Sequence, residues 1–151
     1  MKRSHRSPFL RLTSTFRADV LTQWIAGCST DLASAARHLT EHACHRRLIK
    51  REFAVSSALL EEWCRRGKPP LWAALAAFDL RLNNGWRPET SEDWAGFASL
   101  FIKLNESNDL ESLCQKLPDG MDVRIAAGWL TAAMEEDLHY RTRHRIAEGN
   151  L

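Results

Sequence analysis

The sequence lacks any long hydrophobic run, and this absence argues against a protein that spans a membrane. No apolar stretch approaches the roughly 20 residues that a membrane-spanning helix needs. The N-terminal segment MKRSHRSPFLRLTSTFR has no apolar core of the kind that a secretory signal contains. We therefore expect a soluble protein of the cytoplasm with no membrane partner.

Glycine and proline are also scarce, with 7 and 5 residues among 151. So few glycines give no phosphate-cradling loop, and the nucleophile motif G-x-S-x-G is missing. The acidic stretch MEEDLH has the spacing of an ordinary solvated helix face. The sequence therefore predicts neither an enzyme nor a bound cofactor.

The four cysteines include no C-x-x-C pair. They are Cys28, Cys44, Cys64 and Cys114. Wide, irregular spacing is typical of buried thiols in a reducing compartment rather than of disulfides or a zinc site.

Strict alternation of apolar and polar residues, the mark of a half-buried strand, is missing as well. The apolar spacing is helical almost throughout, and 151 residues is about the length of one domain. We predict an all-α, compact, single-domain bundle of six or seven helices over residues 15–151. The first fourteen residues contain no acid and little apolar periodicity, so we expect a mobile basic arm there.

Turn residues and capping residues place the helix boundaries. The expected helices are Thr15–Gly27, one from Thr30, one ending at Gly67, one from Pro69 or Pro70 to Leu82, one opened by a capping box of Thr90 with Asp93, a short one ending at Leu117, and a long one from Val123.

What the chain does have is charge that is unevenly distributed. Residues 1–68 carry 13 Lys/Arg against 6 Asp/Glu, whereas residues 69–151 carry 8 against 13. We therefore distinguish a basic half, residues 15–68, from an acidic half, residues 69–151. The basic half favours DNA as a partner, and the acidic half is available for a protein partner or for homodimerisation.

The segment after Thr30 changes its helical phase. Leu32, Ala36, Leu39 and Ala43 share one face, but the apolar residues after Leu48 lie on a sector turned by about 140°. Either a turn interrupts the helix between Thr40 and Arg46, or one long helix is packed on two sides. A turn would create a helix-turn-helix with EHACHRRLIKREF as its second helix. The candidate nucleic-acid-binding residues are then Arg46, Arg47, Lys50, Arg51, His42 and His45.

The stretch RRLIKREFAVSSALL, residues 46–60, resembles the second half of the helix-turn-helix in AraC-type regulators. The order of an Arg, an apolar pair, Lys, a basic–acidic pair, an apolar residue and Val-Ser carries this resemblance. Leu32 and Ala33 resemble the start of the first helix of that motif. The resemblance implies a regulator that binds DNA.

Three histidines of this segment suggest a metal site as an alternative. His38, His42 and His45 stand at i, i+4 and i+7, and two histidines at i, i+4 can bind one zinc. His38 and His45 are, however, separated by about 10 Å of helix rise, and no fourth ligand follows. A histidine row along a helix seam or an exposed face is the better interpretation, and we expect no metal.

Two functions therefore stand open. The first is a small helical regulatory protein that binds nucleic acid through the basic segment. The second is a helical protein-interaction module, such as an adaptor, a secretion-associated chaperone or an assembly subunit. Trp86 and Arg87 in the loop NNGWRP favour the second, as an exposed partner-binding anchor, unless Trp86 is a lid over the core.

Overall fold

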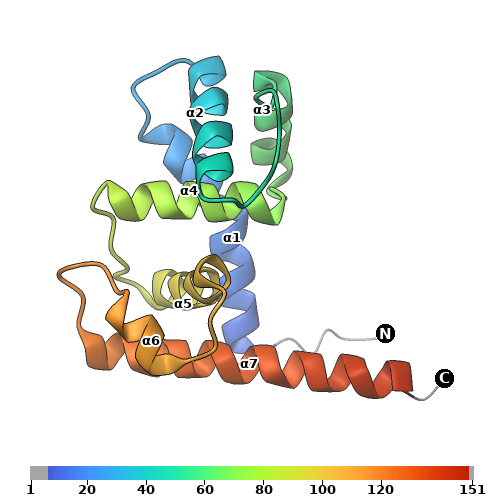
Figure 1. Ribbon diagram of the computed structural model, residues 1–151, viewed down its shortest axis with the longest axis vertical. Coiled ribbons are helices and arrows are strands. Elements are labelled where there is room, and N and C mark those ends of the chain that lie inside the picture. Colours follow the sequence, from blue (N-terminus) through green and yellow to red (C-terminus); the bar gives the residue numbers. More distant parts are fainter. Residues whose placement is uncertain (1–6, 150–151) are drawn as a thin grey trace. The chain divides into compact units, whose positions relative to one another are not determined.

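A computed structural model describes the backbone of residues 7–149 and the side chains of residues 7–138. Within these residues it contains seven α-helices and no strand, which confirms the predicted all-α class (Figure 1). The helices are α1 (Pro8–Ala26), α2 (Leu32–His45), α3 (Ser57–Arg66), α4 (Leu71–Asn83), α5 (Ser91–Asn105), α6 (Leu110–Gln115) and α7 (Val123–Gly149). The chain divides into two compact units, one of them Thr15–Arg87 and the other formed by the residues on either side of it. We call Thr15–Arg87 the basic unit and residues 88–138, whose side chains are described, the acidic segment.

The first helix begins seven residues earlier than the sequence predicted. The Ser7 hydroxyl accepts a hydrogen bond from the Leu10 amide at 3.0 Å, and Pro8 occupies the first helical position. A proline suits that position because its missing N–H has no partner there anyway. Phe9 stacks on Trp129 at 6.3 Å between ring centroids. Residues 8–14, which were expected to form a mobile arm, therefore belong to α1, and the first six residues of that arm lie outside the part of the chain described.

Capping residues determine where α2 begins and where α3 begins and ends. Asp31 caps α2 by accepting from the Ser34 amide at 2.8 Å, and Ser56 caps α3 by accepting from the Leu59 amide at 3.1 Å. Gly67, with φ of 65°, ends α3 in the left-handed region that glycine adopts without strain.

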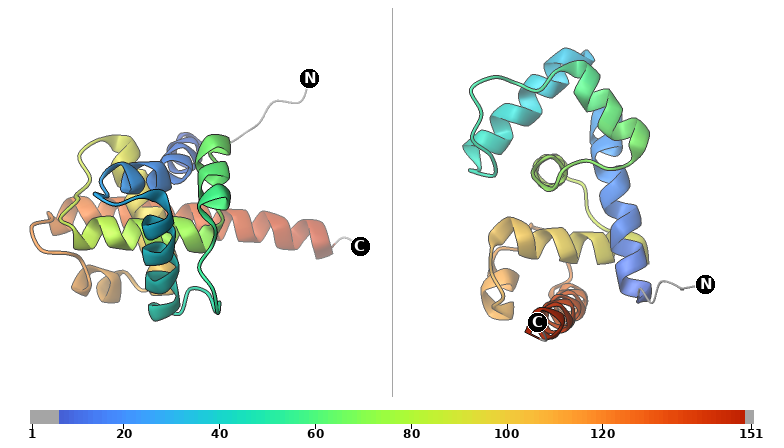
Figure 2. Two further views of the ribbon diagram at one scale, coloured as in Figure 1. Left: turned by 90° about the horizontal axis from the view of Figure 1, so that it is seen from above. Right: turned by 90° about the vertical axis from the view of Figure 1, so that its right-hand side faces the viewer.

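In the basic unit α4 lies at the centre, and it is buried along nearly its whole length. Nine of its thirteen residues are buried. The right-hand view of Figure 2 looks along α4, with α1, α2 and α3 arranged around it. The start after Pro70 and the burial confirm the sequence prediction of a central buried helix in this position.

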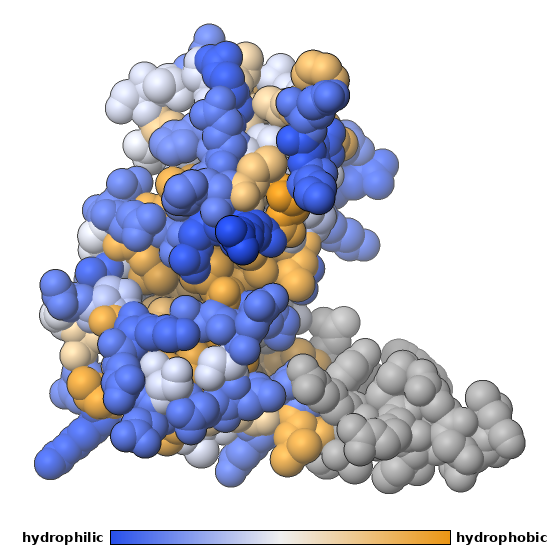
Figure 3. Space-filling view, viewed as in Figure 1, coloured by the Kyte–Doolittle hydropathy of each residue, from blue (hydrophilic) through white to orange (hydrophobic). Residues whose placement is uncertain are grey.

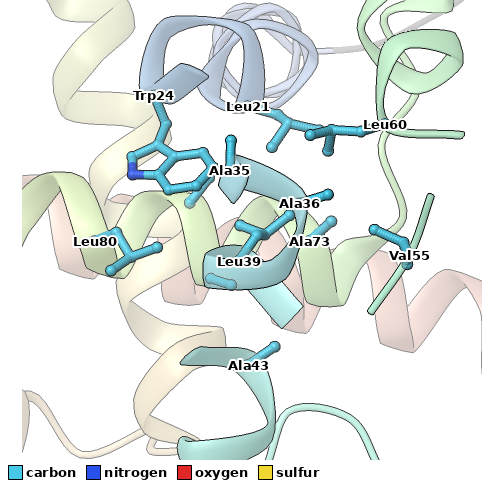
Figure 4. Close-up of a cluster of buried hydrophobic side chains, with 12 residues drawn as sticks. Leu21, Trp24, Ala35, Ala36, Leu39, Ala43, Val55, Leu60, Ala73 and Leu80 are labelled. Carbon is cyan, nitrogen blue, oxygen red and sulfur yellow. The ribbon is translucent and has the colours of Figure 1, made fainter. Parts of the chain in front are cut away.

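The hydrophobic core of the basic unit brings small and large side chains together from α1 to α4 (Figure 4). Alanines let the helices approach closely, and leucines fill the space between them. The buried members are Leu21, Trp24, Ala35, Ala36, Leu39, Ala43, Val55, Leu60, Ala73, Ala76, Ala77 and Leu80.

The other unit contains α5, α6 and α7, with α5 and α6 packed on α7. Thr90 and Asp93 form the predicted capping box at the start of α5. Phe97 is fully buried on α5 and stacks on Phe101 at 4.9 Å between centroids. Asp109 caps α6 by accepting from the Ser112 amide at 3.0 Å.

Candidate functional site: the basic loop

The end of α2 is set by backbone hydrogen bonds around Arg47. The Arg47 amide donates to the Cys44 carbonyl at 3.0 Å, and the Leu48 amide donates to the Ala43 carbonyl at 2.8 Å. This pair of bonds is the Schellman arrangement, which needs a left-handed residue at the position of Arg47. Arg47 adopts φ of 62° without being a glycine. Of the two alternatives, the structure therefore has the turn, but it lies at residues 46–48, after the interval between Thr40 and Arg46 in which it was expected.

A second helix over EHACHRRLIKREF was expected, and this expectation is wrong. Residues 46–56 form an irregular segment between α2 and α3, which we call the basic loop. Leu48 and Ile49 pack against the core of the basic unit, and Val55 is buried in it. A continued helix would have turned these apolar residues away from the face that α2 buries, so the chain leaves the helix instead.

The basic loop is fixed near both ends. Leu48 and Ile49 hold its first part, and the Val55 amide donates to the Thr40 hydroxyl of α2 at 3.2 Å. That hydroxyl donates in turn to the Ala36 carbonyl at 2.8 Å. Leu48, Ile49 and Val55 are therefore held in place, whereas the loop is exposed at residues 46–47 and 50–54.

The exposed residues of the loop include cations and an aromatic ring. Arg47, Lys50 and Arg51 are exposed, and Phe53 is 76% exposed. The Arg51 Nε donates to the Phe53 carbonyl at 3.2 Å, which brings the guanidinium and the ring into one local turn. On the face seen in Figure 3, hydrophilic residues cover most of the surface over α2 and α3.

Arg46 and His42 differ from the other predicted nucleic-acid-binding residues because they face an acid. Asp79 of α4 is buried, and its Oδ2 lies 2.7 Å from His42 Nε2 and 3.2 Å from Arg46 Nε. Both partners lie one helical turn apart near the end of α2, so one carboxylate joins α2 to α4. Arg46 and His42 therefore contribute to the shape of the site more directly than to ligand contacts.

His45 lies beside the loop rather than in the row that the sequence suggested. A cleft of about 580 Å³ separates the end of α2 from residues 51–54, and His45, Arg37 and Arg51 line it together with Cys44 and Phe53. We call it the loop cleft. The Cys44 thiol donates to the Arg51 carbonyl at 3.7 Å.

The three histidines of α2 have three different environments. His38 is exposed and meets Trp24 edge to face at 5.9 Å, His42 faces Asp79, and His45 lines the loop cleft. No group of three or more His, Cys, Asp or Glu residues in the described part of the chain is placed to hold a metal ion.

Trp86 and Arg87, the predicted partner-binding residues, close the end of α4. The Trp86 ring packs on Phe16 at 5.5 Å and Phe78 at 6.3 Å between centroids. Arg87 Nη1 donates to the carbonyls of Leu82 and Trp86 at 3.1 and 2.7 Å. Trp86 is half-buried, so of the two interpretations the structure favours the lid over an exposed anchor.

Sequence reasoning missed two residues of this site. The sequence analysis gives Asp79 no role, although a buried acid in an otherwise apolar helix needs a charged or hydrogen-bonding partner. Phe53 was assigned to an apolar helix face, and no local signal separated it from the buried Leu48 and Val55.

Comparison of the chain with protein-family models, with curated proteins and with solved structures gives no match. Within the described residues, no helix combines the length and the apolar character needed to cross a membrane. The helix-turn-helix resemblance of residues 46–60 stays a prediction, and the function has to be argued from the site itself.

Proposed function

We propose that the basic loop binds nucleic acid, with Arg47, Lys50 and Arg51 contacting phosphates and Phe53 stacking on a base. The protein would then be a small regulatory protein whose acidic segment stays free for a protein partner or a second copy of the chain. The observation that carries the proposal is one loop in which three cations are exposed together with a ring that is 76% exposed.

Exposure of this ring has a free-energy cost that a folded chain normally avoids. Burying a phenylalanine side chain contributes about 1.5–3 kcal/mol, yet Phe53 lies in solvent between a buried Val55 and a partly buried Ile49. Proteins that bind single strands combine a basic surface with aromatic rings on which bases stack. The basic loop has both features within seven residues.

The fixed ends of the loop support binding as well. An ordered loop loses less conformational entropy when it binds than a mobile one. The Thr40 hydroxyl and the packing of Leu48 and Ile49 provide this order. Asp79 adds to it by holding Arg46 at the first position of the loop.

The geometry favours backbone contacts and stacking over reading of base edges in a duplex. A helix-turn-helix inserts a helix into the major groove, with a connection of 3–4 residues between its two helices. Residues 46–56 form a loop instead, and α3 pairs Arg65 and Arg66 with its own Glu62. We therefore expect single strands to bind more tightly than duplexes of the same sequence.

Fluorescence anisotropy with labelled single-stranded and double-stranded oligonucleotides over a range of salt concentrations tests the proposal. The triple variant R47A/K50A/R51A should lose most of the affinity at low salt. For a single strand, each lost phosphate contact lowers the slope of log affinity against log salt by about 0.7, so three lost contacts lower it by about 2. F53A should weaken binding by roughly tenfold while leaving the salt slope unchanged.

The matched control is R65A/R66A/K68A, which removes the same charge from the same unit outside the loop. It should retain most of the binding. If wild-type protein binds neither oligonucleotide at 50 mM salt, or if both triple variants lose binding equally, the basic loop is not a nucleic-acid site.

A protein partner is the second candidate, and the loop cleft favours it. Phe53 borders this cleft together with two acids, Glu41 and Glu52, next to Arg37 and Arg51. Mixed charges around an aromatic residue suit a peptide better than a polyanion. Recovery of a protein that survives nuclease treatment, and that is lost with F53A but not with R65A/R66A/K68A, would support this candidate.

A further inference from the structure

A second cleft of the basic unit lies where α1 and α4 end, and its lining differs from that of the basic loop. Trp24 comes from the last part of α1, His38 from α2, and Arg81 and Trp86 from the end of α4 and the turn after it. The turn between α1 and α2 closes it with Cys28, Ser29 and Thr30. We call it the aromatic cleft.

The size and walls of the aromatic cleft suit a small molecule. Its volume is about 580 Å³, within the roughly 300–1,000 Å³ typical of ligand pockets. Two indole rings contribute to its walls, and the amides of Gln23 and Asn84 add hydrogen-bonding groups. Apolar walls with a few polar groups are the usual composition of a site that orients a ligand.

The charge of the lining has one sign. Arg81 brings a guanidinium into the cleft, and His38 brings an imidazole, whereas none of the described lining residues is Asp or Glu. The Cys28 thiol donates to the Trp24 carbonyl, and burial raises its pKa above the ordinary value, so it adds no negative charge at neutral pH. A cleft of this charge favours anions.

The cation is held in a defined position. The Arg81 guanidinium carbon lies 5.2 Å from the centroid of the Trp86 ring, a cation–π arrangement. Phe16 and Phe78 hold that ring, as described above, and Gly85 makes the tight turn before it with φ of 97°. The turn needs a glycine because other residues are strained at that φ.

We propose that the aromatic cleft binds a small molecule that combines a flat ring with a carboxylate or phosphate group. The ring lies against the indoles of Trp24 and Trp86, and the anionic group contacts Arg81, with the Gln23 and Asn84 amides setting its orientation. This site is independent of the proposed nucleic-acid binding by the basic loop.

Pairs of ligands that differ in charge test the proposal without any mutation. The probes are indole-3-acetate with indole-3-acetamide, and adenosine monophosphate with adenosine, each titrated into the isotopically labelled full chain. The readout is the indole N–H signals in two-dimensional NMR. Trp24 and Trp86 should shift while Trp94 and Trp129, which belong to the other unit, do not.

The charged member of at least one pair should bind about tenfold more tightly than its neutral partner, as expected for a charge-assisted hydrogen bond. Tighter binding of indole-3-acetate identifies a carboxylate ligand, and tighter binding of adenosine monophosphate identifies a phosphate ligand. Equal affinity within both pairs, or an absence of shifts at Trp24 and Trp86, overturns the proposal.

Variants then locate the anion. R81Q should reduce the affinity for the charged probe about tenfold and leave that for its neutral partner unchanged. K68Q is the matched control, because it removes one exposed positive charge from the same unit outside the cleft. Thermal unfolding shows whether R81Q is folded. H38A changes an exposed residue of the cleft and is a second cleft variant for the same titrations. If K68Q weakens binding as much as R81Q, the charge of the unit rather than the cleft is responsible, and the proposal fails.

Discussion

The basic unit and the acidic segment use their acidic residues in different ways. Residues 15–87 carry 11 Lys/Arg and 7 Asp/Glu, a net charge of +4, whereas residues 88–138 carry 3 and 11, a net charge of −8. In the basic unit, Glu62 pairs with Arg65 and Arg66, and Asp79 faces His42 and Arg46.

In the acidic segment, each of the three helices has an acid at its start, a role that Asp31 has for α2 in the basic unit. Asp93 completes the capping box of α5, Asp109 caps α6, and Asp122 accepts from the Arg124 and Ile125 amides at the start of α7. Negative charge at a helix N-terminus is favoured by the helix dipole. This segment is acidic partly because each of its helices starts with an acid, whereas in the basic unit two of the seven acids are paired with cations and four of the five charged residues of the basic loop are positive.

The largest expected effect tests whether the cores of the two regions contribute equally to the free energy of unfolding. Truncating the fully buried Phe97 on α5 should lower the free energy of unfolding by about 3–5 kcal/mol, and truncating the fully buried Leu39 on α2 should lower it by about 2–5 kcal/mol. Chemical denaturation measures both values. A loss below 1 kcal/mol for F97A would show that the acidic segment contributes little to the stability of the chain.

The next effect concerns the buried acid of the basic unit. D79A should destabilise the chain by about 2 kcal/mol, since it removes the shared partner of His42 and Arg46. The expected value lies below the 3–5 kcal/mol typical of a broken buried pair because the Arg46 side chain is 37% exposed and partly solvated.

Arg46 supplies the control for this prediction. R46A removes one of the two partners and leaves Asp79 with His42, so chemical denaturation should show a smaller loss than for D79A. Equal stability of D79A and wild type would mean that the carboxylate does not join α2 to α4 in solution.

Much of this comparison could be predicted from the sequence, and the part that could not has a physical cause. The sequence predicted the helix ends that local residues mark, such as the end of α3 at Gly67 and the start of α5 at the capping box of Thr90 and Asp93. The end of α2 was not, because Arg47 adopts a left-handed conformation that arginine does not favour and that no local signal announces. The change of helical phase left open a turn or a long helix packed on two sides. The path that the chain takes depends on Leu48, Ile49 and Val55 entering a core formed by distant residues.

The candidate site was predictable in the same partial way. The charges of Arg47, Lys50 and Arg51 are visible in the sequence, but their placement on a loop is a tertiary result. The pairing of Asp79 with α2 joins residues 37 positions apart, and the aromatic cleft joins three helices. Neither arrangement has a signature in local spacing.

Two substitutions at helix ends, one in each region, should change the stability of the chain in opposite directions. T90A removes the capping-box hydroxyl and should cost about 1 kcal/mol. R47G relieves the left-handed conformation and should gain about 1 kcal/mol, less the entropy that glycine loses on folding. Thermal unfolding of both variants measures the signs, and a destabilised R47G would show that the arginine side chain stabilises the loop by contacts that outweigh its strain.

The smallest effect belongs to Asp31, the exposed acid that caps α2 in the basic unit. Hydrogen bonds from Ser34 lower the pKa of its carboxyl in the folded chain. Because the folded value lies below the unfolded one, the contribution of Asp31 to stability is complete above the ordinary pKa of aspartate and is lost as the pH falls through the lowered value. Asparagine also caps helices but does not titrate. D31N should therefore match the wild type near pH 7 and lose less stability than the wild type below about pH 4, where the ordinary aspartate pKa lies. Thermal unfolding of the two proteins across this range gives the difference directly, and parallel acid profiles would mean that the Ser34 hydrogen bonds do not persist in solution.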